Sequence, residues 1–185
     1  MIRIFVADAI SWTWGTPDDL WCYLPRVLEL VAAGEFGRYD IGGLFTAMRA
    51  GWSDWRCDQR DAVTGYLNAL WRATIGGYWL PCKLDVLDLL EAAGDLGIPV
   101  DSFLHAWETD SSEPAALHLA WLIRHRPSRR GRGAAEWSQA TNQWMRGPGS
   151  RRVLASAVAV ASTPEIADNL SGALGILDTW EDPSD

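Results

Sequence analysis

Cysteine and histidine are scarce in this sequence. Three of each occur among the 185 residues, namely Cys22, Cys57, Cys82, His105, His118 and His125. No two cysteines are spaced as CxxC, and three cannot all pair in disulfides, which favours reduced thiols and hence a cytoplasmic protein. His118 and His125 are seven residues apart, or about 10 Å along a helix, which is too far to share one ion. We therefore expect no metal and no other cofactor.

Lysine is almost absent, and so are the short motifs of well-known enzymes. Lys83 is the only lysine, and it does not belong to a GxxxxGKS/T phosphate loop. The GxSxG and HExxH patterns, which place a serine nucleophile or two zinc ligands, are missing as well. A cysteine that meets a distant histidine in space is the remaining route to a nucleophile. We expect no enzymatic activity, and an enzyme without a recognised motif stays an open alternative.

Long apolar runs are also missing. The stretch 153–161 is too short to cross a bilayer and is interrupted by Ser156. Near the N-terminus, the apolar stretch 4–10 is interrupted by Asp8, and no small-residue cleavage site follows it. We expect a soluble cytoplasmic protein that does not contact a membrane.

What the sequence does contain is the pattern of a single all-α domain over residues 1–185. Apolar residues make up 48% and charged residues 22% of the chain, a balance typical of globular domains. Pro25 predicts a break or kink in the first helix, and residues 2–6 fit one short strand. We expect residues 1–15 to form an N-terminal extension and residues 181–185 a frayed acidic tail. Amphipathic spacing and capping residues predict helices over about residues 17–33, 41–50, 57–74, 83–93, 100–109, 113–126, 134–146, 150–161 and from 164 onward.

A weak internal repeat appears at an offset of 43 residues. Five small or apolar positions match at this offset: Ile41, Leu44, Ala47, Ala50 and Gly51 correspond to Leu84, Leu87, Leu90, Ala93 and Gly94. Short helices in antiparallel pairs with a period in the forties resemble HEAT- and armadillo-type repeat proteins over about residues 17–126. This resemblance implies a stack of helix pairs, and an irregular helical bundle is the alternative architecture.

Charge is segregated along the chain, whose net charge is −8. Residues 61–115 carry two basic and nine acidic side chains, whereas residues 116–152 carry eight basic side chains and one acidic. Within the acidic segment, three or four residues separate successive members of the series Asp85, Asp88, Glu91 and Asp95. The first three should therefore form a ridge on one helix face. A solvated surface, a contact for a basic partner, and a carboxylate pair for acid–base or divalent-cation chemistry all fit this pattern.

Arginines concentrate in two segments, 124–133 and 146–152, which lie on either side of a predicted helix. The candidates for an anion site in these segments are Arg126, Arg129, Arg130, Arg132, Arg151 and Arg152. The second segment also opens a helix after Gly147, where free backbone N–H groups favour an anion. Phosphate or nucleic acid, an acidic protein surface, and plain solvation of the loops remain open. A helix of about 13 residues places the two segments about 20 Å apart.

Tryptophan is unusually frequent, with 12 residues in the chain. Most are expected in the core, where the indole N–H needs a partner. Trp137 and Trp144 are seven residues apart and share a helix face. Trp52 and Trp55 fall in a stretch predicted to be a loop, where burial is harder to achieve. We therefore predict that these two indoles contribute to a recognition surface.

Taken as a set, these features favour a non-enzymatic protein that acts through protein–protein contact. An acidic surface accelerates association with a basic partner and excludes that partner's natural ligand. A bacterial antagonist of the immunity-protein or antitoxin type is the specific hypothesis, with the acidic helix face and Trp52 and Trp55 as the contact. The alternative is a helical module that binds nucleic acid or phosphate through the arginine segments.

Overall fold

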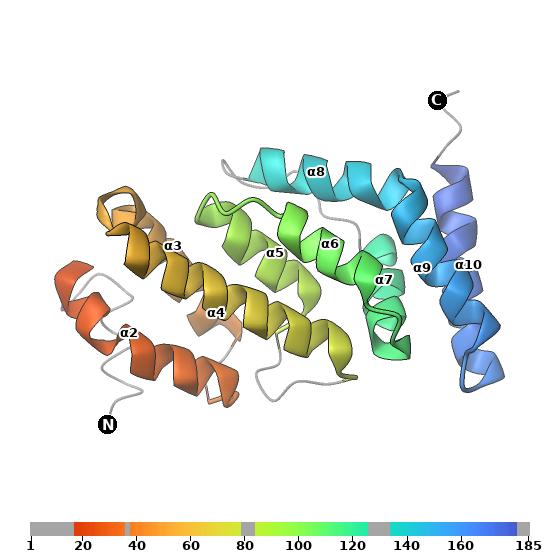
Figure 1. Ribbon diagram of the computed structural model, residues 1–185, viewed down its shortest axis with the longest axis horizontal. Helices are drawn as coiled ribbons and strands as arrows, with labels where there is room; N and C mark the ends of the chain where they lie inside the picture. Colours follow the sequence, from red (N-terminus) through yellow and green to blue (C-terminus); the bar gives the residue numbers. More distant parts are fainter. Residues whose placement is uncertain (1–16, 36–37, 79–83, 126–133, 181–185) are drawn as a thin grey trace.

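The computed structural model describes residues 17–35, 38–78, 84–125 and 134–180, and most of them are helical (Figure 1). No strand occurs within these ranges, so the predicted all-α class is confirmed. The strand predicted at residues 2–6, the extension 1–15 and the tail 181–185 lie outside the described residues.

The described helices follow the predicted order closely. They are α2 (Pro17–Ala32), α3 (Arg38–Gly51), the short 3-10 helix η1 (Trp52–Asp54), α4 (Cys57–Gly76), α5 (Val86–Asp95), α6 (Asp101–Thr109), α7 (Glu113–Arg124), α8 (Ala134–Arg146), α9 (Pro148–Ala159) and α10 (Pro164–Thr179).

Local capping explains several of these boundaries. The Thr163 hydroxyl accepts a hydrogen bond from the Ile166 N–H at 3.3 Å and begins α10 as predicted. The Ser112 hydroxyl accepts one from the Ala115 N–H at 3.4 Å and begins α7. Helix α9 starts two residues before the predicted position, because Pro148 occupies the first helical position, where its missing N–H costs nothing.

Helices α5 and α2 also differ from the sequence-based prediction. The helix predicted over residues 83–93 begins at Val86, because the Asp85 side chain accepts hydrogen bonds from the N–H groups of Leu87 and Asp88 and caps the helix. Helix α2 continues through Pro25, so of the predicted break or kink the break does not occur. Leu24 and Val27 on either side of Pro25 are buried in the core, and this tertiary packing outweighs the local preference of proline.

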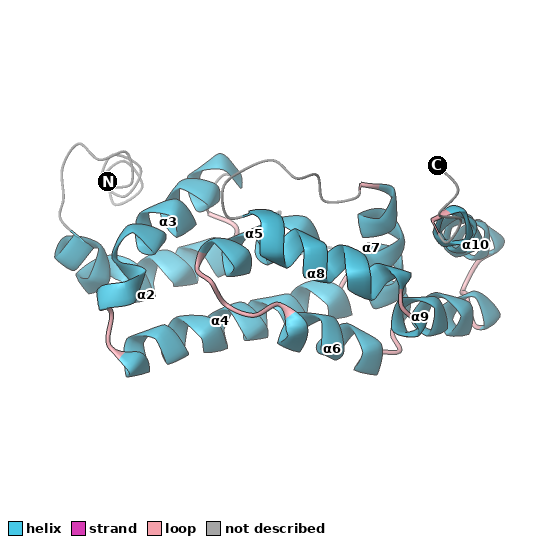
Figure 2. Ribbon diagram, turned by 90° about the horizontal axis from the view of Figure 1, so that it is seen from above, coloured by secondary structure: helices cyan, strands magenta, loops and turns pink. Residues whose placement is uncertain are grey.

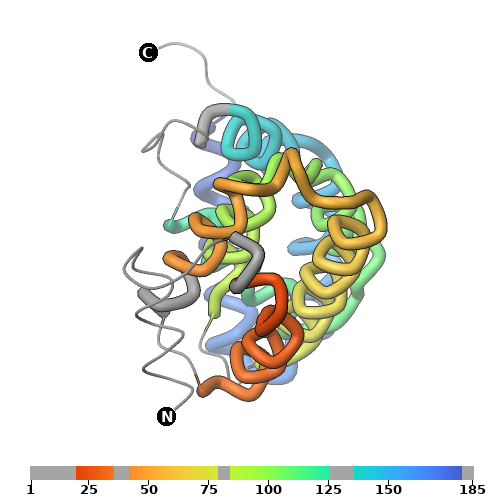
Figure 3. The backbone as a smooth tube through the Cα atoms, turned by 90° about the vertical axis from the view of Figure 1, so that its left-hand side faces the viewer, coloured from red at the N-terminus to blue at the C-terminus, as the bar shows by residue number. Residues whose placement is uncertain are grey.

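The helices stack in two rows (Figure 1). In one row α3, α5, α7 and α10 contact one another in succession, and in the other row α4, α6 and α9 do so. Helix α2 lies beside α3 and is joined to α4 by the Tyr66 hydroxyl, which donates to the Leu28 carbonyl at 2.9 Å. Figure 3 looks along this stack from the α2 end. Helix α8 belongs to neither row and packs across α5, α6 and α9 (Figure 2).

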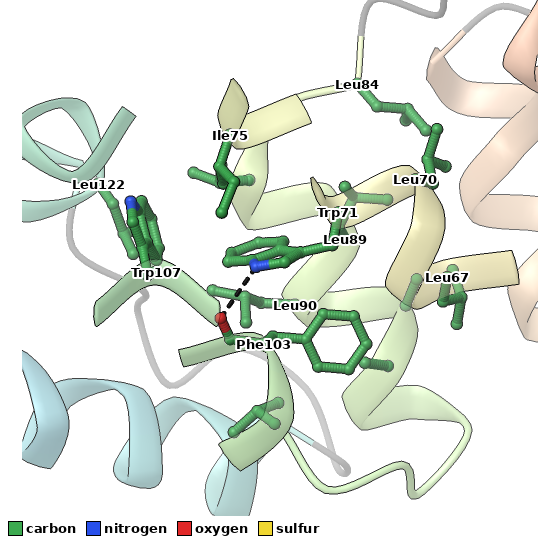
Figure 4. Close-up of a cluster of buried hydrophobic side chains, with 14 of the residues drawn as sticks. Leu67, Leu70, Trp71, Ile75, Leu84, Leu89, Leu90, Phe103, Trp107 and Leu122 are labelled. Atoms are coloured by element: carbon green, nitrogen blue, oxygen red, sulfur yellow. Dashed lines mark hydrogen bonds between the residues drawn. The ribbon is translucent and has the colours of Figure 1, made fainter. Parts of the chain in front are cut away.

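Aromatic side chains fill the centre of the stack, where α4, α6 and α7 meet (Figure 4). Trp71 and Trp107 are fully buried, and their rings meet edge to face at 5.0 Å between centroids. Each indole N–H donates to a backbone carbonyl, from Trp71 to Phe103 at 2.9 Å and from Trp107 to Ala115 at 2.7 Å. These bonds satisfy the only polar group that each buried ring carries. The core therefore contains some of the tryptophans that the composition predicts to be buried.

Candidate functional site

An acidic groove lies between α3 and α5. It is a cavity of about 180 Å³ lined by Gly42, Phe45, Thr46, Leu84, Asp88, Glu91, Ala92 and Asp95. Phe45, Leu84 and Ala92 are buried and provide an apolar floor. Three residues of α5 with carboxylate side chains, Asp88, Glu91 and Asp95, line the groove beside this floor.

The structure divides the four predicted acidic residues into two groups. Asp88, Glu91 and Asp95 line the acidic groove, whereas Asp85 does not. The Asp85 carboxylate is engaged by the first backbone N–H groups of α5, and the Asp88 carboxylate accepts the Asp85 N–H at 3.0 Å in return. Asp95 lies 3.6 Å from the Arg49 guanidinium of α3, in a pair that is partly open to solvent. The ridge predicted from Asp85 to Glu91 is therefore wrong at its first residue, which caps the helix.

Trp52 and Trp55 are not isolated surface indoles. Trp55 packs against Trp21 of α2 at 4.6 Å between ring centroids and against Trp52 at 5.2 Å. Both rings are half-buried and pack onto the hydrophobic core. Neither of them lines the acidic groove. The indoles and the carboxylates predicted to act together therefore do not line one common cavity.

The arginine segments are described only in part. Arg126, Arg129, Arg130 and Arg132 lie outside the described residues. Arg124, the last residue of α7, donates to the side-chain and backbone oxygens of Asn169. Arg151 lies 2.5 Å from the Asp178 carboxylate and donates to the Leu177 carbonyl at 3.0 Å. Arg124 and Arg151 thus tie neighbouring helices to α10, and Arg152 is exposed.

The start of α9, predicted to favour an anion, already has a carboxylate beside it. A methyl group placed on Gly149 would come within 2.2 Å of the Glu108 Oε1 atom, so the Glu108 carboxylate packs directly on this glycine. The positive end of the helix dipole favours a negative charge at this point. Glu108 of α6 therefore occupies part of the space that an external anion would need at Gly149.

A second cavity, which the sequence did not predict, lies between α6 and α8. Its volume is about 370 Å³, and Asp101, Leu104, His105, Glu108, Ala140, Gln143 and Trp144 line it. We call it the tryptophan pocket. The lining residues of α6 are three or four positions apart and therefore share one face of that helix. The lining residues of α8 show the same spacing and share one face of α8. Only the packing of two helices far apart in the chain brings these faces together.

Trp144 holds a defined position in the tryptophan pocket. Its ring stacks on the buried Trp107 ring at 5.6 Å between centroids and 20° between planes. Its indole N–H donates to the Glu108 Oε1 atom at 2.7 Å. One face and the polar edge of the indole are therefore fixed by contacts within the protein.

A third polar cluster joins distant parts of the chain through Glu113, at the start of α7. Its carboxylate accepts hydrogen bonds from the Tyr78 hydroxyl at 2.5 Å, from the Ser162 N–H at 2.6 Å and from the Ser162 hydroxyl at 2.9 Å. The Tyr78 bond, followed by the two from Ser162, holds the pKa of Glu113 below its ordinary value. The same bond raises the pKa of Tyr78. This arrangement connects three segments, so we interpret it as a structural clamp.

Within the described residues, no three Cys, His, Asp or Glu side chains gather in a way that would hold a metal ion. None of the helices described here has the length and apolar character needed to span a bilayer. Comparison with protein-family models gives no match, and neither the curated proteins nor the solved structures yield a significant match.

Proposed function

We propose that this chain is a non-enzymatic binding protein that recognises a basic protein partner through the acidic groove between α3 and α5. The observation that supports this proposal is the geometry of the groove, in which Asp88, Glu91 and Asp95 of α5 line one side next to an apolar floor. Apolar floors with charged rims are typical of protein interfaces, where burial supplies affinity and charge sets the choice of partner.

The class of partner follows from the sign of the charge. The carboxylates of the groove belong to segment 61–115, which carries nine acidic and two basic side chains. Such a surface attracts a positively charged partner over several ångströms and raises the association rate. A protein that acts on nucleic acid carries a basic surface, and a basic surface is what the acidic groove would attract. An immunity protein or antitoxin that covers that surface is the specific function we propose, and we propose a cytoplasmic location for it.

We also propose that the two rows form a short stack of the HEAT type. The helices α2, α4, α6 and α9 begin at Pro17, Cys57, Asp101 and Pro148, so successive starts are separated by roughly 40 to 50 residues, as in such repeats. Of the positions that match at an offset of 43 residues, the first set falls on α3 and the second, apart from Leu84, falls on α5, and these helices are neighbours in one row. Repeat stacks commonly use an extended face for binding.

The test is a copurification from the native host with two charge variants. E91K/D95N alters the acidic groove, and D61K/D168N is the matched control, because Asp61 and Asp168 are exposed and the change in charge is the same. Asp88 is left unchanged because its carboxylate completes the capping box of α5. Exposed charges rarely contribute more than about 1 kcal/mol to stability, so circular dichroism should show both variants folded.

The proposal predicts a stoichiometric basic protein, identified by mass spectrometry, that the wild type and D61K/D168N retain and E91K/D95N loses. Nucleic acid in the purified sample, recognised by a high ratio of absorbance at 260 and 280 nm, would favour the alternative function. Loss of that nucleic acid in the R129S/R130S/R132S variant would then assign it to the arginine segment. Retention of the basic protein by E91K/D95N would refute the groove as the contact.

A further inference from the structure

We infer that the tryptophan pocket between α6 and α8 binds the guanidinium group of an arginine side chain on a basic protein. This inference deepens the proposed function, because it names a side chain by which the basic partner is recognised. It concerns a cavity separate from the acidic groove, since the two cavities have no lining residue in common.

The tryptophan pocket has an aromatic wall formed by Trp144. One face of Trp144 stacks on Trp107, which is fully buried. The ring is half-buried and lines the cavity, so a ligand in the cavity would meet the part of the indole that Trp107 does not cover. A cation over the face of tryptophan is attracted by the ring quadrupole. Donation of the indole N–H to the Glu108 carboxylate increases the electron density of the ring and strengthens that attraction.

The pocket also has polar side chains that can interact with a cation. Asp101 and Glu108 lie on one face of α6, with His105 between them. The side chains of Asp101, His105 and Gln143 form no hydrogen bond or ion pair with any residue that the structure describes. Among the described residues that line the cavity, none is lysine or arginine. The pocket therefore has two carboxylates, an amide and an imidazole and no fixed cation of its own.

Guanidinium fits this combination better than the other common ligand groups. It is planar, delocalised and weakly hydrated, so it stacks on an indole while its five N–H donors point outward in the plane. Those donors can then reach carboxylate and amide oxygens at the rim. An ammonium group is a strongly hydrated point charge and loses the stacking. An anion would be repelled by Asp101 and Glu108, and a neutral ligand would gain nothing from their charge.

The size of the cavity agrees with a side chain as ligand. A volume of about 370 Å³ lies near the lower end of the range for small-molecule sites, about 300 to 1,000 Å³. Leu104 and Ala140 supply the apolar part of the lining, against which the methylene stem of an arginine can pack. The pocket thus accommodates both parts of the side chain.

The test uses the full chain and three short acetylated and amidated peptides that differ at one position. The central residue is arginine, lysine or citrulline, and citrulline keeps the shape of arginine without its charge. Binding is followed by NMR through the side-chain N–H signals of the tryptophans, assigned with a Trp144→Phe variant. We expect a saturable shift of the Trp144 signal with the arginine peptide. The lysine peptide should bind about threefold more weakly, and the citrulline peptide about tenfold more weakly.

Two variants separate this pocket from the rest of the acidic surface. D101N/E108Q removes both charges and keeps an amide oxygen to accept the Trp144 N–H. Circular dichroism should show this variant folded, and the arginine peptide should bind about fivefold to tenfold more weakly. D61N/D168N makes the same change in net charge elsewhere and should leave peptide affinity unchanged.

The possible results distinguish this inference from the proposed function. Equal binding of the arginine and citrulline peptides, or no shift of the Trp144 signal, would overturn the inference while leaving the acidic groove untouched. An affinity of D101N/E108Q for the arginine peptide equal to that of wild type would also overturn it. If the peptide binds as expected but E91K/D95N still retains the basic protein, the proposed role of the acidic groove is wrong and the pocket stands.

Discussion

At the scale of single residues, Glu113 shows how one carboxylate can hold three segments together. It accepts hydrogen bonds from Tyr78, in the connection after α4, and from Ser162, in the connection before α10. The lowered pKa of Glu113 means that the folded protein favours the ionised carboxylate more than the unfolded chain does. Its contribution to stability is therefore fully present above the ordinary carboxyl pKa and is lost as the pH falls through the lower, folded value.

The lowered pKa of Glu113 predicts that the E113Q and Y78F substitutions change the stability of the protein in a pH-dependent way. At neutral pH, E113Q should lower the thermal unfolding midpoint, because glutamine carries no charge to receive the three donors. The difference from wild type should shrink below about pH 4, because the carboxylate of the unfolded chain takes up a proton there before that of the folded protein does. Y78F should show a smaller effect of the same sign, since Ser162 remains. Thermal melts from pH 3 to pH 8 measure both effects.

D168N is the control for this prediction, because Asp168 is exposed and lies on α10 away from the clamp. Its midpoint should follow that of wild type at every pH. A difference between E113Q and wild type that stays constant down to pH 3 would mean that the charge of Glu113 is irrelevant to the clamp.

At the scale of helices, the contact between α5 and α8 depends on the absence of a side chain at Gly94. A methyl group at this position would lie 2.0 Å from a ring carbon of Trp137, which is buried. Both helices would have to separate to accommodate it. The space beside Gly94 is thus filled by an indole from a helix some forty residues further along the chain.

Alanine in place of Gly94 should therefore destabilise the protein, whereas alanine in place of Gly65 should stabilise it. G94A should reduce the free energy of unfolding by about 1 to 3 kcal/mol, because it overpacks the contact with Trp137. Gly65 is exposed within α4 and has no neighbour within 4 Å of an added methyl group. G65A should raise the free energy of unfolding by about 0.5 to 1 kcal/mol through helix propensity alone. Urea denaturation measures both, and a stabilising G94A would contradict the packing described here.

The helices themselves could be predicted from the sequence, because their signals are local. Thr163, Ser112 and the apolar spacing within each helix act over three or four residues. Asp85 was misassigned because aspartate on a helix face and aspartate at a helix start have the same spacing to Asp88. Only the hydrogen bonds from the Leu87 and Asp88 N–H groups distinguish these two roles.

The candidate sites could be predicted only in part, because they depend on contacts between distant segments. Glu91 and Asp95 were identified from charge alone, but their apolar floor comes partly from Phe45 of α3. The tryptophan pocket was missed because α6 and α8 meet through tertiary packing. The stacking of Trp144 on Trp107 joins rings 37 positions apart in the sequence, and no short-range periodicity predicts such a pair.

At the scale of the whole molecule, the segregation of charge along the chain has two structural consequences. The acidic segment 61–115 supplies the carboxylates of both the acidic groove and the tryptophan pocket. Arg151 of the basic segment 116–152, by contrast, pairs with Asp178 of α10. Part of the positive charge is thus balanced within the protein, whereas both described cavities carry negative groups. This distribution supports a basic partner more than an anionic one.

The most direct test of this account is the association rate of the copurified partner measured as a function of salt. For wild type, the rate constant should fall steeply as the ionic strength rises, because electrostatic attraction is screened. At low salt, E91K/D95N should associate about tenfold more slowly than wild type, while D61K/D168N should change the rate far less. Unchanged association of E91K/D95N, together with loss of binding in R129S/R130S/R132S, would contradict the account and assign recognition to the arginine segment.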